Sequence, residues 1–204
     1  GRSMNVEYGN EIGLRLLLGL ISMVASRLEL GIKPLFVHSI RNYLRVYVRV
    51  NVGSRYAESM PSKLGYIHHC FSCSSRTYTN QTDHHKICDI CNKPMRFAGP
   101  LWIEKIFDPD FIDEMLYSIN DCNVDKKCYK ILSLAREETN MPPTYFSIDK
   151  ISERMKATPP TMSTMIDRLQ SSGFSATRTS LRFTGFKTNA KYNEILDLFR
   201  TLVA

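Results

Sequence analysis

Long apolar runs are missing from this sequence of 204 residues. The best candidate, residues 16–25, falls short of the roughly 18 to 20 apolar residues that span a bilayer, and it follows Arg15. The N-terminus also lacks the basic, apolar and small-residue order of a secretory signal peptide. We therefore expect a cytoplasmic protein with no membrane partner, in which paired cysteines are more often metal ligands than disulfides.

Internal repeats and low-complexity tracts are also absent, and the composition is that of a globular protein. Hydrophobic residues make up 43% of the chain and aromatic residues 10%. The formal net charge is +7, and the acidic residues are concentrated in residues 104–140, between basic segments. A basic balance is compatible with a polyanionic partner but does not establish one.

The N-terminal residues indicate a helix followed by a short strand. Apolar residues recur every three or four positions from Asn10 to Leu28, which is typical of a helix with one buried face. Gly31 and Pro34 are expected to end this helix, and residues 35–37 predict a short buried strand after it.

A second strand is predicted over residues 44–50. Leucine and valines alternate there with Arg45, Tyr47 and Arg49, so the strand would have one apolar face and one basic, aromatic face. A solvated outer face of an edge strand is the simpler interpretation of the second face. A helix flanked by short strands is an α/β pattern, but this one is too short to close a sheet alone.

Four cysteines in two pairs form the most specific motif. Cys70 and Cys73 make one Cys-x2-Cys pair and, after fourteen residues, Cys88 and Cys91 make another. A two-residue spacer lets both sulfurs of a pair point to the same side, so two pairs can supply four thiolates to one tetrahedral ion. Four protein ligands leave no open position, so residues 61–103 predict a structural zinc ribbon without Lewis-acid chemistry.

Other interpretations of the cysteines stay open from the sequence. The same four residues also suit disulfides, free thiols or an iron–sulfur cluster. Four histidines share the segment, and we expect them to lie near the metal or in solvent rather than to bind it: His68, His69, His84 and His85. Cys122 and Cys128 have no partner pair, so we expect both to pack in the core.

Residues 147–190 predict two helices followed by a two-stranded ribbon. Ser147 can cap the first helix, Thr158 can cap the second with prolines in its first turn, and Gly173 ends the second. Residues 174–186 are rich in Thr, Arg and Phe, and they suit two strands and a turn. The order of helix, turn, helix and β-wing is typical of a winged-helix domain.

Four landmarks, taken in chain order, resemble a known family. They are residues 11–19 (EIGLRLLLG), residues 42–50 (NYLRVYVRV), the cysteine pairs followed by residues 99–102 (GPLW), and residues 176–179 (ATRT) with 185–190 (GFKTNA). Through nearly all of residues 5–192 the chain resembles the C-terminal half of the tRNA (guanine-26) N2-dimethyltransferases. Members of that family join an S-adenosylmethionine-binding Rossmann-like domain to a C-terminal tRNA-binding region, and they methylate the exocyclic amine of a guanine.

The resemblance implies a mixed α+β chain in four parts. Residues 5–56 would be the C-terminal remnant of a Rossmann-like methyltransferase sheet, and residues 61–103 the zinc ribbon. Residues 104–146 would be an acidic helical connector, and residues 147–204 a winged-helix-like tRNA-binding domain. We expect structural Zn²⁺ as the cofactor, tRNA as the partner, and a missing or separately encoded catalytic half as a second partner.

Two motifs of the family are missing from this sequence. They are the glycine-rich strand-to-helix turn that holds S-adenosylmethionine and the acidic-proline motif beside the target amine; residues 108–111 (DPDF) lie too far along the chain to be the latter. The Arg-Thr-His-Phe of the family also reads Arg178-Thr179-Ser180-Leu181 here. We therefore predict no catalytic or cofactor-binding residue in this chain, S-adenosylmethionine binding only in the complete enzyme, and no methylation by this polypeptide alone.

The family resemblance also implies a set of phosphate contacts from basic residues on the second strand and the wing. They are Arg41, Arg45, Arg49, Arg178, Arg182, Lys187 and Lys191. Tyr43 and Tyr47 are candidates for stacking on bases or for packing. The alternative function is a zinc-ribbon and winged-helix DNA-binding regulator, but the outward face of its second helix would carry one basic residue, Arg168.

Overall fold

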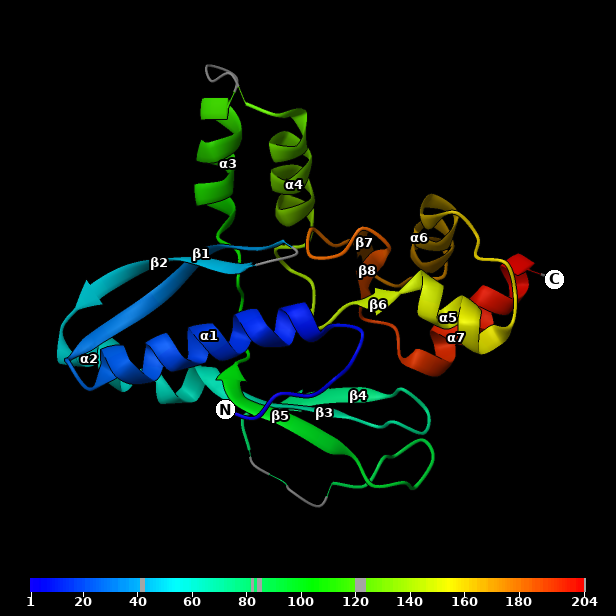
Figure 1. Cartoon of the computed structure of the whole chain (residues 1–204), viewed down its shortest axis with the longest axis horizontal. Coiled ribbons are helices and arrows are strands. Elements are labelled where there is room, and N and C mark those ends of the chain that lie inside the picture. Colours follow the sequence, from blue (N-terminus) through cyan, green and yellow to red (C-terminus); the bar gives the residue numbers. More distant parts are fainter. Residues whose placement is uncertain (41–42, 82, 84–85, 120–123, 204) are drawn as a thin grey trace. The chain divides into compact units, whose positions relative to one another are not determined.

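The protein divides into two compact units. The computed structural model describes residues 1–40, 43–81, 83, 86–119 and 124–203. The N-terminal unit is Gly1–Ile106 and the C-terminal unit is Phe107–Ala204, and Figure 1 traces the elements of each. The four domains expected from the sequence stay a prediction within this division.

The N-terminal unit is built around helix α1, Gly9–Ser26. This helix packs against strands β1 (Leu30–Ile40), β2 (Tyr43–Val52) and β5 (Arg96–Trp102). A Cβ atom at Gly13 would overlap the side chain of Leu44, and one at Gly19 would lie 3.1 Å from the Cα atom of Leu101. These two glycines therefore let β2 and β5 approach the helix closely.

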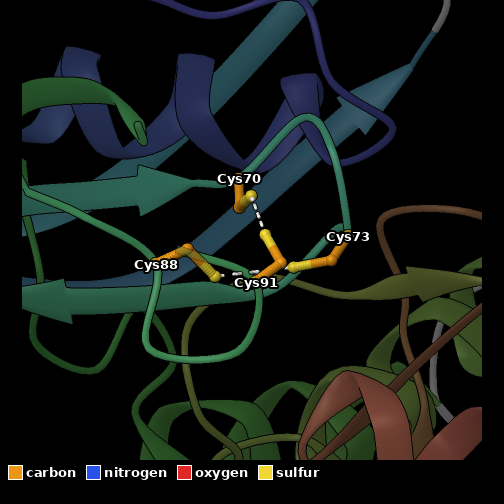
Figure 2. Close-up of side chains that lie close together, drawn as sticks. All are labelled: Cys70, Cys73, Cys88 and Cys91. Carbon is orange, nitrogen blue, oxygen red and sulfur yellow. Dashed lines mark hydrogen bonds between the residues drawn. The ribbon is translucent and has the colours of Figure 1, made fainter. Parts of the chain in front are cut away.

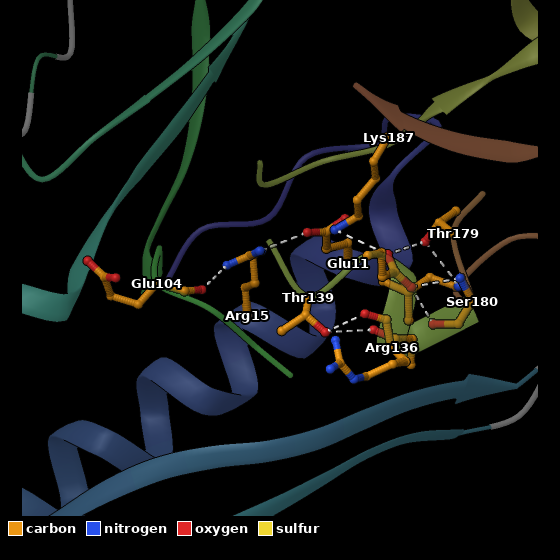
Figure 3. Close-up of polar contacts among 11 residues, drawn as sticks. Glu11, Arg15, Glu104, Arg136, Thr139, Thr179, Ser180 and Lys187 are labelled. Carbon is orange, nitrogen blue, oxygen red and sulfur yellow. Dashed lines mark hydrogen bonds and ion pairs between the residues drawn. The ribbon is translucent and has the colours of Figure 1, made fainter. Parts of the chain in front are cut away.

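By length and composition alone, α1 could pass for a membrane span, with a mean hydropathy of 1.2 over 18 residues. Its buried face, however, carries an ion pair between Arg15 and Glu11, which lie 2.9 Å apart and are 2% and 0% exposed. Arg15 also donates hydrogen bonds of 2.9 Å to the carbonyl oxygens of Trp102 and Glu104, the second of which Figure 3 shows. These contacts join α1 to the end of β5, as expected of a core helix.

Strands β1 (Leu30–Ile40) and β2 (Tyr43–Val52) form an antiparallel ribbon with Leu30 opposite Val52 and Ile40 opposite Tyr43. β2 lies where the alternating pattern predicted a strand. The expected short strand at residues 35–37 was wrong in extent, because β1 has 11 residues and includes Gly31 and Pro34. Pro34 fits within the strand because the register shifts between Pro34 and Phe36.

A three-stranded sheet completes the N-terminal unit. Helix α2 (Ser54–Glu58) and a 3₁₀ turn (Pro61–Lys63) lead into β3, Leu64–His69. β3 is the central strand and pairs in antiparallel fashion with β4, Arg76–Thr79, and with β5. The first cysteine pair directly follows β3, so this sheet sets the position of the cysteines.

The C-terminal unit begins with two helices from the acidic segment, α3 (Pro109–Ser118) and α4 (Lys126–Glu137), which lie side by side in Figure 1. Each begins at an aspartate whose side chain accepts a backbone hydrogen bond: Asp108 from Phe111 at 3.0 Å and Asp125 from Lys127 at 2.9 Å. Asp108 is thus a helix cap, which is a structural role for the start of the DPDF segment.

The remainder of the C-terminal unit surrounds one apolar core. Its elements are β6 (Phe146–Ser147), α5 (Ile148–Met155), α6 (Met162–Ser171), β7 (Ala176–Arg178), β8 (Gly185–Thr188) and α7 (Tyr192–Val203). The strands form an antiparallel sheet in the order β6-β8-β7. Helices and strands both contribute to the core, which includes Ile151, Met165, Phe186 and Phe199.

Two details of this region differ from the sequence-based expectation. The second helix is capped by Thr161, whose hydroxyl accepts from the backbone N–H of Thr164 at 3.2 Å, and not by Thr158. The prolines at 159 and 160 precede the helix instead of opening it. Helix α7 was not expected, although its buried residues Tyr192, Ile195 and Phe199 follow a helical period.

Candidate functional site

The two cysteine pairs lie in turns with the same backbone hydrogen bonds. In the first turn the N–H of Cys70 donates to the carbonyl of Ser75 at 2.8 Å, and the N–H of Ser74 donates to that of Cys70 at 2.8 Å. In the second turn Cys88 donates to Lys93 and Asn92 donates to Cys88, both at 2.9 Å. Ser74 and Asn92 have φ values of 62° and 54°, so each turn closes through a left-handed residue.

These matched turns bring all four sulfurs together (Figure 2). The Sγ atoms of Cys70 and Cys91 are 3.4 Å apart, those of Cys73 and Cys88 are 3.5 Å apart, and all four lie within 4.8 Å of one another. A tetrahedral ion with metal–sulfur bonds of about 2.3 Å holds its sulfurs about 3.8 Å apart. The cluster therefore has the dimensions of a four-thiolate metal site.

The four sulfurs do not hold their protons equally. Burial raises the pKa of Cys70, but hydrogen bonds from the backbone N–H of Cys73 and from neighbouring thiols outweigh it and lower the pKa to about 7. Burial and the adjacent thiols raise the pKa of Cys73 to about 12, and the pKa of Cys91 is also raised. Thiolates this close repel one another, and a divalent cation removes that repulsion. The donor set thus fits a thiolate-preferring metal ion.

The described histidines of the segment have other partners. Nε2 of His68 lies 2.9 Å from the carbonyl oxygen of Asp83, and Nδ1 of His69 lies 3.0 Å from the Tyr8 hydroxyl. Burial and the nearby Arg76 lower the pKa of His69 to about 4, while burial raises the pKa of Tyr8. His69 is therefore neutral at pH 7 and forms part of a buried polar contact. His84 and His85 lie outside the described residues.

Cys128 does not pack in the core, contrary to our expectation. It lies in the first turn of α4 and is exposed, whereas the buried residues of this helix are Leu132 and Ala135. Cys122 lies outside the described residues. Within the part of the chain that the structure describes, only the four paired cysteines form a group suited to a metal ion.

The basic, aromatic side of β2 is present as the alternation predicted. Arg45 lies over the ring of Tyr43, with its Cζ atom 4.9 Å from the ring centroid, and its Nη1 atom is 3.4 Å from the Tyr47 hydroxyl. Tyr43 and Tyr47 are each 41% exposed, and Arg45 and Arg49 are exposed as well. The phosphate contacts at Arg45 and Arg49 stay a prediction, and Arg41 lies outside the described residues.

The basic residues of the C-terminal unit differ in their surroundings. Arg178 and Arg182 are half-buried and Lys191 is exposed, so all three remain predicted phosphate contacts. Lys187 is 1% exposed, and its ammonium lies 3.5 Å from the carboxylate of Glu138. The prediction that Lys187 contacts phosphate is therefore wrong for this structure, because a buried and ion-paired ammonium is not available to RNA.

Glu138, at the end of α4, is a structural residue that sequence reasoning missed. Its carboxylate accepts from the Thr179 hydroxyl at 2.8 Å, from the Ser180 N–H at 2.7 Å and from the Ser180 hydroxyl; the contacts at Thr179 and Ser180 are drawn in Figure 3. The pKa of Glu138 is raised above its ordinary value because burial outweighs the lowering effect of Lys187 and of these hydrogen bonds. Glu138 thus fixes the start of the turn that joins β7 to β8.

Comparison with known proteins agrees with the resemblance noted in the sequence. The chain matches the family described as N2,N2-dimethylguanosine tRNA methyltransferase over residues 1–200. The tRNA (guanine(26)-N(2))-dimethyltransferase of Methanothermobacter thermautotrophicus is 32% identical over 205 aligned positions, which cover 99% of this chain and 54% of that protein. The protein of the same name from Methanosarcina mazei is 32% identical over 203 positions, which cover 98% and 52%. These relatives give no support to a DNA-binding regulator.

A solved structure shares the fold. Trm1 from Pyrococcus horikoshii, in complex with S-adenosyl-L-methionine, superposes with a TM-score of 0.81 at 24% sequence identity, covering 96% of this chain and 51% of that one. The mixed α/β fold is therefore shared with that protein. The chain spans about half the length of the curated relatives it matches. Because the family match covers nearly the whole sequence, the chain belongs to the N2,N2-dimethylguanosine tRNA methyltransferase family.

Proposed function

We propose that this chain is the C-terminal, tRNA-binding portion of an S-adenosylmethionine-dependent tRNA guanine-26 N2-dimethyltransferase. The observation that carries the proposal is the match over residues 1–200 to relatives that are about twice as long. Those relatives are named as guanine-26 dimethyltransferases, and the similar solved structure was obtained with S-adenosyl-L-methionine. The proposed partner is tRNA, and the proposed compartment is the cytoplasm.

The residues of this chain do not fit S-adenosylmethionine. A dinucleotide- or nucleoside-binding turn of the Rossmann type needs closely spaced glycines between a strand and a helix. No two of the ten glycines are within two positions of each other, and the glycines at 9, 13 and 19 lie inside α1. We therefore assign the cofactor and the catalytic residues to another half of the enzyme, and no step of methyl transfer to this chain.

The surface of the N-terminal unit supports the proposal that another half covers it. Leu20 and Val24 lie four positions apart on α1, and Leu28 follows just after the end of the helix; they are 56%, 51% and 66% exposed. On β2, Val50 and Val52 are 52% and 80% exposed. An apolar helix stripe beside a two-stranded ribbon is the kind of surface that a larger sheet and its helices bury.

The cysteine cluster has a structural role in this proposal. Four thiolates complete a tetrahedral zinc site and leave no position for substrate. The zinc would hold the end of β3 and the start of β5 in a ribbon. The winged-helix-like elements α5 to β8 would bind tRNA, and the basic face of β2 would make its own phosphate contacts. Phosphate contacts would come from Arg45, Arg49, Arg178, Arg182 and Lys191.

A methyl-transfer assay tests the proposal that this chain binds tRNA and that another half of the enzyme transfers the methyl group. The chain is incubated with labelled S-adenosylmethionine and an unmodified tRNA transcript, alone and with the separately produced cofactor-binding half of the Methanothermobacter relative. We expect no incorporation by the chain alone and incorporation after the half is added. Turnover by these 204 residues alone would contradict the proposal.

A further inference from the structure

An exposed aromatic ring stands at the tip of the turn that joins β7 to β8, residues 179–184. Phe183 is 76% exposed, whereas Leu181, two residues earlier, is 4% exposed and packs inward. A single exposed apolar residue needs no explanation by itself, because most folded proteins have several. The surroundings of Phe183 are what distinguish it.

Two cations from different elements lie over this ring. The Nζ atom of Lys130, on α4, is 5.4 Å from the ring centroid, and the Cζ atom of Arg178, at the end of β7, is 5.7 Å from it. Lys130 and Arg178 are 48 positions apart in the sequence, so the fold gathers the two charges at one exposed ring. Both distances are within the range of a cation–π contact.

The turn that carries Phe183 is fixed at its base. Glu138 holds Thr179 and Ser180 through the hydrogen bonds described above. At the other end the N–H of Gly185 donates to Arg182 at 3.0 Å, and the N–H of Thr179 donates to Gly185 at 3.2 Å. A ring on an anchored turn loses little conformational entropy when a ligand stacks on it.

The charge at this tip is positive. Lys130 and Arg178 lie over the ring, and Arg182, the residue before Phe183, donates from Nε to the Thr184 hydroxyl at 3.2 Å. The carboxylate of Glu138 is 0% exposed and accepts the hydrogen bonds of the turn, so the nearby surface carboxylate is that of Glu137, which accepts from the Thr177 hydroxyl at 3.1 Å. An exposed ring with adjacent cations matches a ligand that has a π-face and a phosphate.

We propose that Phe183, Arg178 and Lys130 form a binding site for an unpaired nucleotide of RNA. The base stacks on the ring of Phe183, and the two long cationic side chains contact the flanking phosphates. This inference rests on the proposed tRNA-binding function. It adds which residues bind the RNA and that the bound nucleotide is unpaired. Phe183 is therefore a specific contact and not only a surface residue.

The test measures binding of the whole chain to an unmodified tRNA transcript by fluorescence anisotropy at one stated salt concentration. Phe183→Ala and Phe183→Leu should each weaken binding about five-fold or more, because a stacked base is lost. Phe183→Trp should keep the affinity. Lys130→Ala and Arg178→Ala should each reduce the salt slope by roughly 0.7 to 0.9, while Phe183→Ala leaves it unchanged.

Tyr117→Ala is the matched control. Tyr117 is 77% exposed in the same unit, and among the described residues no cation lies over its ring. This variant should bind tRNA within about two-fold of the unchanged chain, since no stacked base is removed. Phe183→Trp adds a direct signal, because stacking on an unpaired base should quench the new tryptophan, whereas Trp102 is 2% exposed and should change little.

The outcomes separate this inference from the proposed function. If the unchanged chain binds tRNA and all Phe183 variants bind equally well, the inference is overturned and the proposed function stands. If the unchanged chain does not bind tRNA, both are overturned. If Phe183→Ala alters only self-association in sedimentation, the ring is a protein contact and the nucleotide site is wrong.

Discussion

Cys88 is 1% exposed and its sulfur lies 3.5 Å from that of Cys73, so water has little access to the sulfur. We predict that Cys88→Ser lowers zinc content from about one ion per chain to near zero, because three thiolates and a hydroxyl bind zinc poorly. Elemental analysis of freshly purified protein provides the measurement. Cys128→Ser, at an exposed cysteine outside the cluster, is the control and should keep the zinc. Full zinc occupancy in Cys88→Ser would show that the cluster is not the site.

Glu138 gives a second prediction for a single residue. Glu138→Ala should lower the free energy of unfolding by about 3 to 5 kcal/mol, because it leaves the buried ammonium of Lys187 without this carboxylate. Denaturant unfolding followed by circular dichroism measures the loss. The double variant Glu138→Leu with Lys187→Met should be less destabilised than Glu138→Ala, since it removes both buried charges. Equal stability of Glu138→Ala and the unchanged chain would contradict the role assigned to the pair.

For single residues, the sequence predicted best those features that depend on neighbours in the chain. A two-residue spacer between cysteines determines which side their sulfurs face, so the four cysteines were correctly expected to lie together. The exposure of Lys187 was not predictable, because it depends on Glu138, which is 49 positions away and carries no motif. The sequence pattern of the wing shows that residue 187 is basic. It does not show that the side chain is buried and paired with a distant carboxylate.

Among the elements, the sheet β4-β3-β5 carries both cysteine turns at one end, where His69 pairs with Arg96. We predict that a zinc chelator unfolds this sheet, because the turns supply few apolar contacts beyond Cys70, Cys88 and Met95. Trp102, the only tryptophan, ends β5 and is 2% exposed, so its emission should shift to longer wavelength. Lowering the pH should release zinc for the same reason that binding it releases protons from the thiols.

The control for this experiment is re-addition of zinc at neutral pH, which should restore the Trp102 emission. Magnesium at the same concentration should not restore it, because Mg²⁺ prefers oxygen ligands. An emission spectrum that does not change when zinc is removed would contradict a structural role for the metal.

The apolar stripe of α1 makes a prediction about docking. Val24→Glu should abolish co-purification with a separately produced cofactor-binding half, because it places a charge in the middle of the stripe. The variant should still fold, since Val24 is 51% exposed. Asn10→Glu, at an exposed position on the same helix, should co-purify like the unchanged chain. Retention of binding by Val24→Glu would show that the half docks elsewhere or not at all.

Elements were predicted best where one period continued undisturbed. The helix at α1 and the strand at β2 both have long, regular patterns. The extent of β1 was missed because glycine and proline usually end elements, whereas pairing with β2 carries the strand through Gly31 and past the register shift at Pro34. The cap of α6 was misplaced because Thr158 and Thr161 are chemically equivalent, and only the backbone decides which hydroxyl reaches an N–H.

For the whole molecule, the resemblance to one family was visible in four short landmarks, and the match over residues 1–200 confirms it. The division at Ile106 lies close to the expected boundary between residues 61–103 and 104–146, where the composition turns acidic. A chain that spans about half the length of its relatives and carries a four-cysteine cluster fits our proposal that it serves substrate binding while another half serves methyl transfer.

Competition binding is the measurement that tests this central claim most directly. A labelled tRNA transcript is bound by the whole chain at one stated salt concentration, and unlabelled tRNA or duplex DNA of equal charge is added as competitor. We predict that tRNA competes at much lower concentration than duplex DNA, because RNA is recognised by its shape and its unpaired bases. Equal competition by both, or no binding of tRNA at all, would contradict the account.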